Sequence, residues 1–119
     1  MKKRIKLISL SSSEVDLKYW HPESKEDVFI CLDIEVGQHG EDGSNMFYVT
    51  LTTPEALRKR RSEHVLSRGR ILIVDDYDYD LVRKLVLEII AGCSAMQWDD
   101  SCAYLQRYFQ WEYEDYIDT

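Results

Sequence analysis

Residues 28–52 decide the fold, and they read VFICLDIEV-GQHGEDGSN-MFYVTLT. The first nine residues predict a β-strand whose second half alternates between inward apolar and outward acidic side chains. The inward side chains are Leu32, Ile34 and Val36, and the outward ones are Asp33 and Glu35. Residues 46–52 are β-branched and aromatic, which favours another strand. Because the glycine-rich residues 37–44 lie between the two strands, they predict a hairpin connection.

Upstream of this hairpin the chain predicts two further strands. Residues 3–11 alternate loosely, and residues 15–20 alternate more strictly. The basic N-terminus is typical of a signal peptide, but Lys6 interrupts the apolar stretch and no small-residue cleavage site follows. We therefore expect a strand there rather than a signal, and a cytoplasmic protein.

Downstream of the hairpin, Thr53 and Pro54 suit the start of a helix, which we expect to run for one or two turns within residues 56–65. Residues 70–74 are apolar and β-branched, and they predict a central strand. A second helix follows, for which Asp78 or Asp80 would be the cap and Gly92 a natural stop. Its apolar residues are Leu81, Val82, Leu85, Val86 and Ile89.

A long final helix is predicted from Trp98 to Tyr116. Its apolar face is formed by Trp98, Cys102, Leu105, Phe109, Tyr113 and Tyr116, which recur every three or four residues. A second aromatic row on the same helix is formed by Tyr104, Tyr108 and Trp111, with Asp115 continuing it and Glu112 between the two rows. Aromatic side chains among carboxylates suit a protein interface, and a wide buried helix face is the open alternative.

These elements predict an α+β fold in a single domain over residues 1–119: a mainly antiparallel sheet of about four or five strands, with two C-terminal helices packed on one face. The 119 residues suffice for one core. No apolar run approaches the roughly 18–20 residues that cross a bilayer, so we expect no membrane span.

The acidic residues concentrate in the C-terminal part of the chain. The formal net charge is -7, and residues 71–119 carry 3 basic and 11 acidic side chains. An acidic field repels phosphates, so we expect no direct binding of nucleic acid, and it favours a basic partner. Solubility alone is the other interpretation of this charge.

Neither a metal nor a cofactor is expected. The three cysteines form no CxxC pair, and Cys31 and Cys102 fall in apolar patterns that predict core positions. Four aspartates within residues 75–80 suggest calcium, but the EF-hand pattern needs Gly and Glu where this chain has Leu81 and Leu87. A phosphate-binding role for the glycine-rich stretch is disfavoured, because acidic residues lie within it and no helix follows.

No catalytic set is legible in the sequence. His21, His39 and His64 lie in or near predicted loops, without an HExxH or GxSxG pattern. Paired carboxylates stay open as an alternative, because spatial pairs do not show in a sequence. The candidates for such a pair are Asp75, Asp76 and Asp78 at a strand end.

Three segments of the chain carry a family resemblance. They are FYVTLTTPEAL at 47–57, ILIVDDYD at 71–78 and, after Trp98, LQRYFQWEYEDY at 105–116. These segments resemble the bacterial Immunity protein 8 family over roughly residues 28–116. The resemblance implies an immunity protein of a polymorphic or contact-dependent toxin system, without enzymatic activity. Such a protein binds the cytotoxic domain of a secreted toxin, so that the producing cell or its siblings survive.

Charge and periodicity do not show this function, but they are compatible with it, since a toxin that attacks nucleic acids would present a basic cleft. We expect contact with the toxin through Tyr108, Trp111, Glu112, Glu114 and Asp115, with Trp111 as the anchor and with Asp76 and Asp78 at the rim. In the alternative, the C-terminal motif is core and the loops at 37–45 and 58–69 make the contacts. Two other hypotheses stay open: a small carboxylate-based hydrolase, and an adaptor or chaperone of a secreted effector.

Overall fold

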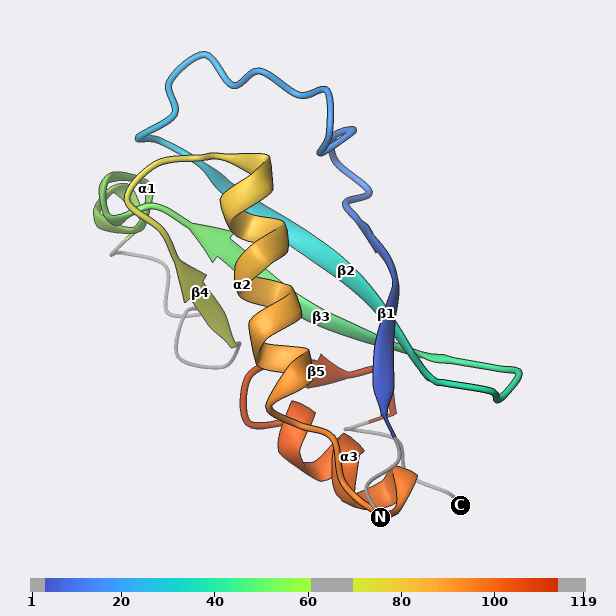
Figure 1. Ribbon diagram of the computed structural model, residues 1–119. Coiled ribbons are helices and arrows are strands. Elements are labelled where there is room, and N and C mark those ends of the chain that lie inside the picture. Colours follow the sequence, from blue (N-terminus) through green and yellow to red (C-terminus); the bar gives the residue numbers. More distant parts are fainter. Residues whose placement is uncertain (1–3, 61–69, 114–119) are drawn as a thin grey trace.

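The computed structural model describes residues 4–60 and 70–113, and within them five strands form one sheet (Figure 1). The strands are β1 (Ile5–Ser11), β2 (Phe29–Gln38), β3 (Asn45–Thr52), β4 (Ile71–Ile73) and β5 (Gln110–Trp111). The helices are α1 (Pro54–Lys59), α2 (Tyr79–Ala91) and α3 (Trp98–Leu105). The strand order is β1-β2-β3-β4, and β5 also pairs with β3. The predicted α+β class and mainly antiparallel sheet are confirmed.

The hairpin of β2 and β3 is the centre of the sheet. The two strands pair antiparallel from Phe29 opposite Thr52 to Val36 opposite Asn45. Gly40 and Gly43 in the connection have φ angles of 78° and 94°, a region that L side chains rarely adopt. The predicted hairpin is therefore confirmed, and its glycines have a conformational reason.

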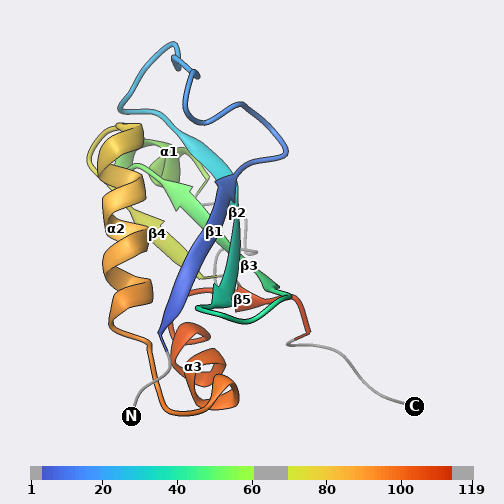
Figure 2. The same cartoon turned by 45° about the vertical axis from the view of Figure 1, so that its right-hand side comes forward.

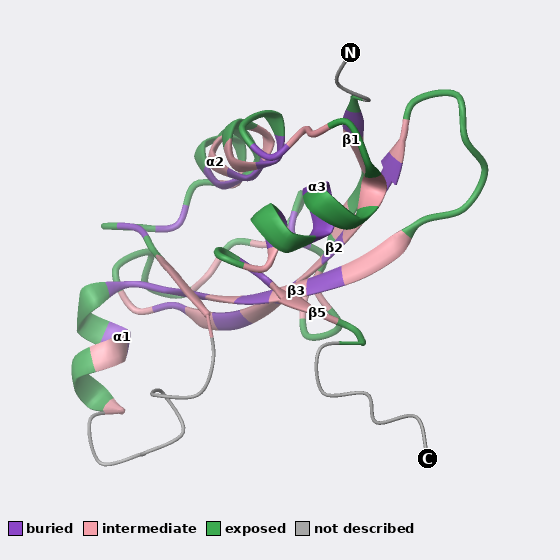
Figure 3. Cartoon of the chain, turned by 90° about the horizontal axis from the view of Figure 1, so that it is seen from below, coloured by how far each residue is buried: buried purple, intermediate pink, exposed green. Residues whose placement is uncertain are grey.

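One face of the sheet carries the core. Figures 2 and 3 show α2 and α3 together on this face, as predicted, whereas α1 lies at one end of the sheet. Alternate residues of β2 and β3 point toward the two helices. The residues of α2 that pack against them, Val82, Val86 and Ile90, are four positions apart, as on one face of a helix. The buried side chains in this layer include Leu32, Ile34, Val36, Phe47, Val49, Leu51, Val82, Val86, Ile90, Leu105 and Phe109.

Both predicted caps are present. The Thr53 hydroxyl accepts a hydrogen bond from the Ala56 N–H at the start of α1 and another from the Val28 N–H at the start of β2. Asp78, the first of the two candidate caps, accepts from the N–H groups of Asp80 and Leu81. Side-chain oxygens thus satisfy backbone donors that the first turn leaves free.

The long final helix predicted over residues 98–116 is wrong. α3 ends at Leu105, residues 106–109 form a turn, and β5 then pairs antiparallel with β3. The apolar periodicity marks residues that are buried, but it does not mark a continuous helix. Leu105 and Phe109 are both fully buried, and Phe109 reaches the core from the turn. Pairing with an edge of β3 supplies backbone hydrogen bonds that compete with those of a continued helix.

The strand predicted over residues 15–20 does not form, because other groups of the fold hold this segment. The Tyr19 N–H closes a turn on the Asp16 carbonyl, and the Leu17 carbonyl accepts from the Tyr77 hydroxyl. Leu17 is buried, whereas Tyr19 is 68% exposed, so the two residues do not share one face of a strand.

The run at residues 70–74 forms a strand that lies at an edge rather than in the centre. β4 is outermost in the path of the described strands and pairs parallel with β3, with Thr50 opposite Ile71. α1 ends at Lys59, and residues 61–69 of the predicted helix and loop lie outside the described residues. None of the helices in the described part is long and apolar enough to cross a membrane.

Candidate protein-binding surfaces

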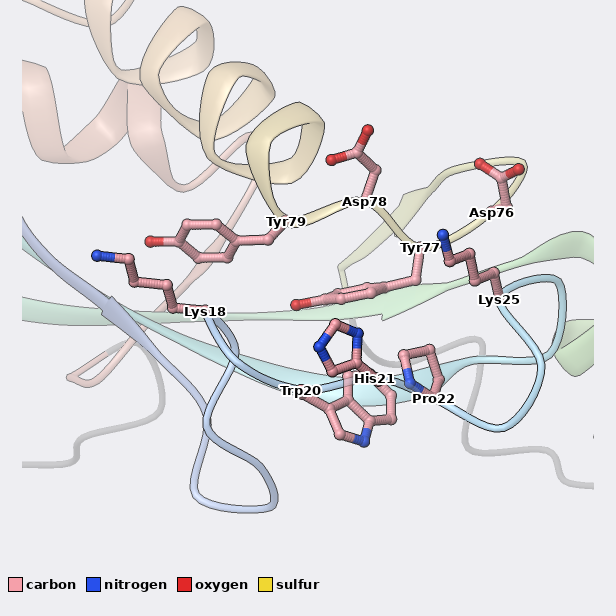
Figure 4. Close-up of a pocket in the computed structure, with 9 residues that line it drawn as sticks. All are labelled: Lys18, Trp20, His21, Pro22, Lys25, Asp76, Tyr77, Asp78 and Tyr79. Carbon is pink, nitrogen blue, oxygen red and sulfur yellow. The ribbon is translucent and has the colours of Figure 1, made fainter.

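Asp76 and Asp78, two of the predicted contact residues, line a groove of about 380 Å³ at the N-terminal end of α2 (Figure 4). Its opposite wall comes from the loop between β1 and β2. The lining residues are Lys18, Trp20, His21, Pro22, Lys25, Asp76, Tyr77, Asp78 and Tyr79. The groove thus brings together residues about 50 positions apart in the sequence.

Tyr77 joins the two walls of the groove. Its hydroxyl donates to the Leu17 carbonyl at 2.7 Å, its N–H donates to the Lys25 carbonyl at 2.8 Å, and its ring meets Trp20 edge-to-face at 4.9 Å. Burial, with smaller contributions from Tyr79 and Asp78, raises the pKa of Tyr77 to about 12. The phenol is therefore a neutral structural group that fixes the loop on the helix.

The charges in the groove balance each other. Lys18 and Lys25 lie on the loop wall, and Asp76 and Asp78 lie on the helix wall. Figure 4 shows both carboxylates pointing away from the rings of Tyr77 and Tyr79. Among the described residues no hydrogen bond joins His21 to either aspartate, so the groove presents no acid–base pair at hydrogen-bond distance.

Tyr108 lies at the other end of α2, in the turn after α3. It is 49% exposed and lines two shallow cavities of about 250 and 180 Å³, both of which also touch Ile89. Since α2 has 13 residues, its ends are about 20 Å apart. Tyr108 and the two aspartates therefore belong to separate surfaces.

Trp111 and Glu112 lie at the edge of the sheet. Trp111 is partly buried against the core, meets Tyr113 edge-to-face at 5.3 Å, and has an indole N–H without an acceptor among the described residues. Glu112 is exposed, and its carboxylate accepts from the Met46 N–H at 3.0 Å and from the Asn45 amide at 3.4 Å. Trp111 is therefore a packing residue in this structure, whereas Glu112 holds the end of β3 and stays accessible.

The predicted aromatic row on one helix does not exist. Tyr104 lies in α3, Tyr108 in the following turn and Trp111 in β5. The described members of the predicted contact set fall in three places, and the remaining two, Glu114 and Asp115, lie outside the described residues.

A surface that the predicted contact set largely missed is the face of the sheet opposite α2 and α3, here called the open face. We define it by Asp33 and Glu35 of β2, by Met46, Tyr48 and Thr50 of β3, and by Glu112 at the β3 edge. The outward position of Asp33 and Glu35 was legible in the sequence. Which face stays uncovered depends on the path of the helices, and local periodicity does not contain that information.

The cysteines and acidic groups show no metal chemistry in the part of the chain that the structure describes. No cluster of three or more potential ligands occurs there. Cys93 and Cys102 are buried free thiols, whereas Cys31, predicted for the core, is only partly buried. Burial raises the pKa of Cys102 to about 12, so this thiol is a poor nucleophile at neutral pH.

The family model described as Immunity protein 8 matches residues 5–116, nearly the whole chain. The chain belongs to the Immunity protein 8 family. No curated protein and no solved structure matches it.

The resemblance predicted from three segments is thereby confirmed. The match to the Immunity protein 8 family also extends upstream to residue 5, through β1 and the loop that forms the groove. Membership in an immunity protein family supports an immunity function and a toxin partner in general, and it suggests a non-enzymatic role.

Proposed function

We propose that this Immunity protein 8 member neutralises a cognate secreted toxin by stoichiometric binding to the cytotoxic domain of that toxin. The single observation that carries the proposal is the family match over residues 5–116, because it spans every described helix and strand rather than one motif. The chain would act as one immunity domain in the cytoplasm of the producing cell, within a polymorphic or contact-dependent toxin system.

The surface chemistry supports a protein partner. The acidic excess of residues 71–119 would raise the rate of encounter with a basic toxin domain and disfavour nucleic acid. Asp76, Asp78, Tyr108 and Glu112 are exposed and accessible to such a partner. The predicted contacts at Trp111, Glu114 and Asp115 remain part of the proposal, with Trp111 acting from its partly buried position.

Co-expression with the toxin encoded beside this gene tests the proposal. Cells that express the toxin domain alone should die, and cells that also express this chain should grow. An unrelated acidic protein of similar size is the control for charge alone. If the cells die although both proteins accumulate in soluble form, the chain does not neutralise that toxin. Growth with undiminished toxin activity in the purified complex would instead indicate an adaptor or chaperone.

A further inference from the structure

The open face is a sheet surface without a partner in the described structure. The hairpin register places Asp33 opposite Tyr48 and Glu35 opposite Met46, and these side chains are partly exposed. α2 and α3 lie on the other side of the sheet (Figure 3), and no described helix covers the centre of this face. An uncovered face of an antiparallel sheet is normally polar, and charged residues on neighbouring strands commonly pair with opposite signs.

The carboxylates of this region depart from that pattern, because they lack basic partners. Glu35 accepts hydrogen bonds from the Ser9 and Ser44 hydroxyls, and Glu14 accepts one from the Cys31 N–H. Among the described residues, neither these carboxylates nor those of Asp33 and Glu112 form an ion pair with Lys or Arg. Four acceptor groups of this surface therefore have no ion-pairing partner in the part of the chain that the structure describes.

Two basic groups of the described residues lie at the limits of the face. Lys6 is opposite Gly37 at the far end of β1, and Arg60 stacks on the Phe29 ring at 4.0 Å beside α1. Burial and the neighbouring Glu14 charge raise the pKa of Asp33. Burial, Glu112 and Asp33 likewise raise the pKa of Tyr48. Both shifts have the direction that a cation from outside the chain would reverse.

Apolar side chains occupy the same face. Met46 and Tyr48 lie two residues apart along β3. On one side of them is β2, which carries Asp33 and Glu35, and on the other is the edge that carries Glu112. Ile8 is 45% exposed above Gly37, where an added Cβ would lie 2.7 Å from the Ile8 Cδ1 atom. An apolar and aromatic centre with charged groups around it is the usual composition of a protein interface.

The other surfaces offer weaker complementarity. In the groove, Lys18 and Lys25 offset the two aspartates. The cavities beside Tyr108 are small. Arg70 and Arg107 line one of them and disfavour a basic partner there, whereas the other has the single carboxylate of Glu88. The open face gathers three carboxylates, those of Asp33, Glu35 and Glu112, around the apolar side chains of Met46 and Tyr48.

We propose that the open face is the surface that docks the toxin, and that it binds a basic protein surface whose Lys or Arg side chains reach Asp33, Glu35 and Glu112 around a contact centred on Met46 and Tyr48. This inference rests on the proposed function, since it names the surface and the chemistry of the partner.

The test measures the affinity of the purified full chain for the cytotoxic domain of the toxin encoded beside it. The face variant combines Asp33→Asn, Glu35→Gln and Glu112→Gln, which keep an oxygen acceptor at each site. The control variant combines Asp80→Asn, Glu88→Gln and Asp100→Asn on the exposed surface of α2 and α3. Both variants remove three negative charges, so the long-range attraction between the chain and a basic partner changes similarly in both. The variants differ only in where on the surface the charges are removed. Tyr48→Ala probes the apolar centre, and thermal unfolding verifies that each variant is folded.

We expect the face variant and Tyr48→Ala each to weaken binding by at least ~10-fold, and the control to change it by less than ~3-fold. Wild-type affinity in folded face variants would overturn the open face as the docking surface and leave the proposed function standing. A further variant, Asp76→Lys, probes the groove. If only this variant loses affinity, the groove and not the open face is the docking surface. Absence of binding by the wild-type chain would refute the proposed function and this inference together.

Discussion

Substitution Tyr77→Phe tests how the loop between β1 and β2 is held on α2. The variant keeps the ring, which is 4% exposed and packs against Trp20, and removes only the hydroxyl that donates to the Leu17 carbonyl. That carbonyl would be left buried without a donor. We therefore expect the free energy of unfolding to fall by about 1–2 kcal/mol at neutral pH, and the melting temperature to fall by roughly 4–8 °C for a domain of this size.

The same variant carries a pH signature. The pKa of Tyr77 rises from 10.0 to about 12 in the folded chain. Because the folded-state pKa lies above the unfolded one, the stability from the neutral phenol is complete below pH 10 and is lost as the pH rises toward 12. The stability difference between wild type and Tyr77→Phe should therefore narrow in that window.

Urea unfolding of both proteins over this pH range measures the difference directly. Tyr19→Phe is the matched control, since Tyr19 is 68% exposed and should lose no stability as Phe. Equal stability of wild type and Tyr77→Phe at neutral pH would contradict a stabilising role of this hydroxyl, and a difference that does not change up to pH 12 would contradict the raised pKa of Tyr77.

Three further outcomes follow from particular residues. Thr53→Val should lower the free energy of unfolding by about 2–3 kcal/mol in urea titrations, because Thr53 is fully buried and accepts two backbone N–H groups. Phe109→Ala should cost about 3–5 kcal/mol, whereas Tyr104→Ala, at a 41% exposed site of α3, should cost less than ~1 kcal/mol; equal losses would contradict the different burial of the two rings. In the native protein Cys31 should react with a thiol reagent well before Cys102, since Cys31 is partly exposed and the pKa of Cys102 is about 12; simultaneous labelling would contradict the described burial.

The β2–β3 hairpin and the first two helices could be predicted because their signals are local. Alternation through Asp33 and Glu35 marks β2, the glycines mark the hairpin, and Thr53 and Asp78 are caps that bind their own helix. Each of these signals acts over a few residues, so sequence reasoning finds them without knowledge of the tertiary structure.

The errors occur where tertiary contacts compete with local preference. Phe109 is buried and has the spacing of the apolar helix face. The next two residues nevertheless pair with β3 as a strand, so the helix does not continue. Residues 15–20 alternate as a strand would, but Tyr77, about 60 positions away, takes the Leu17 carbonyl. Neither competing partner is visible within a short sequence window.

The candidate site shows the same division. Carboxylates and aromatics could be identified as interface chemistry from the sequence, but their grouping depended on a helix that ends early. The structure separates Asp76 from Tyr108 by the length of α2 and places Glu112 beside Met46 and Glu35 instead. The sequence therefore predicts which types of residue a candidate surface contains better than it predicts which individual residues lie together on it.

The most direct test of toxin neutralisation is a titration of the purified toxin domain with this chain while the toxin's activity is measured. We predict that residual activity falls in proportion to added chain and reaches zero at one equivalent, with a one-to-one complex in solution. Unchanged activity at several equivalents would contradict the account. Complete loss at far below one equivalent would also contradict it, because it would show turnover by an enzyme.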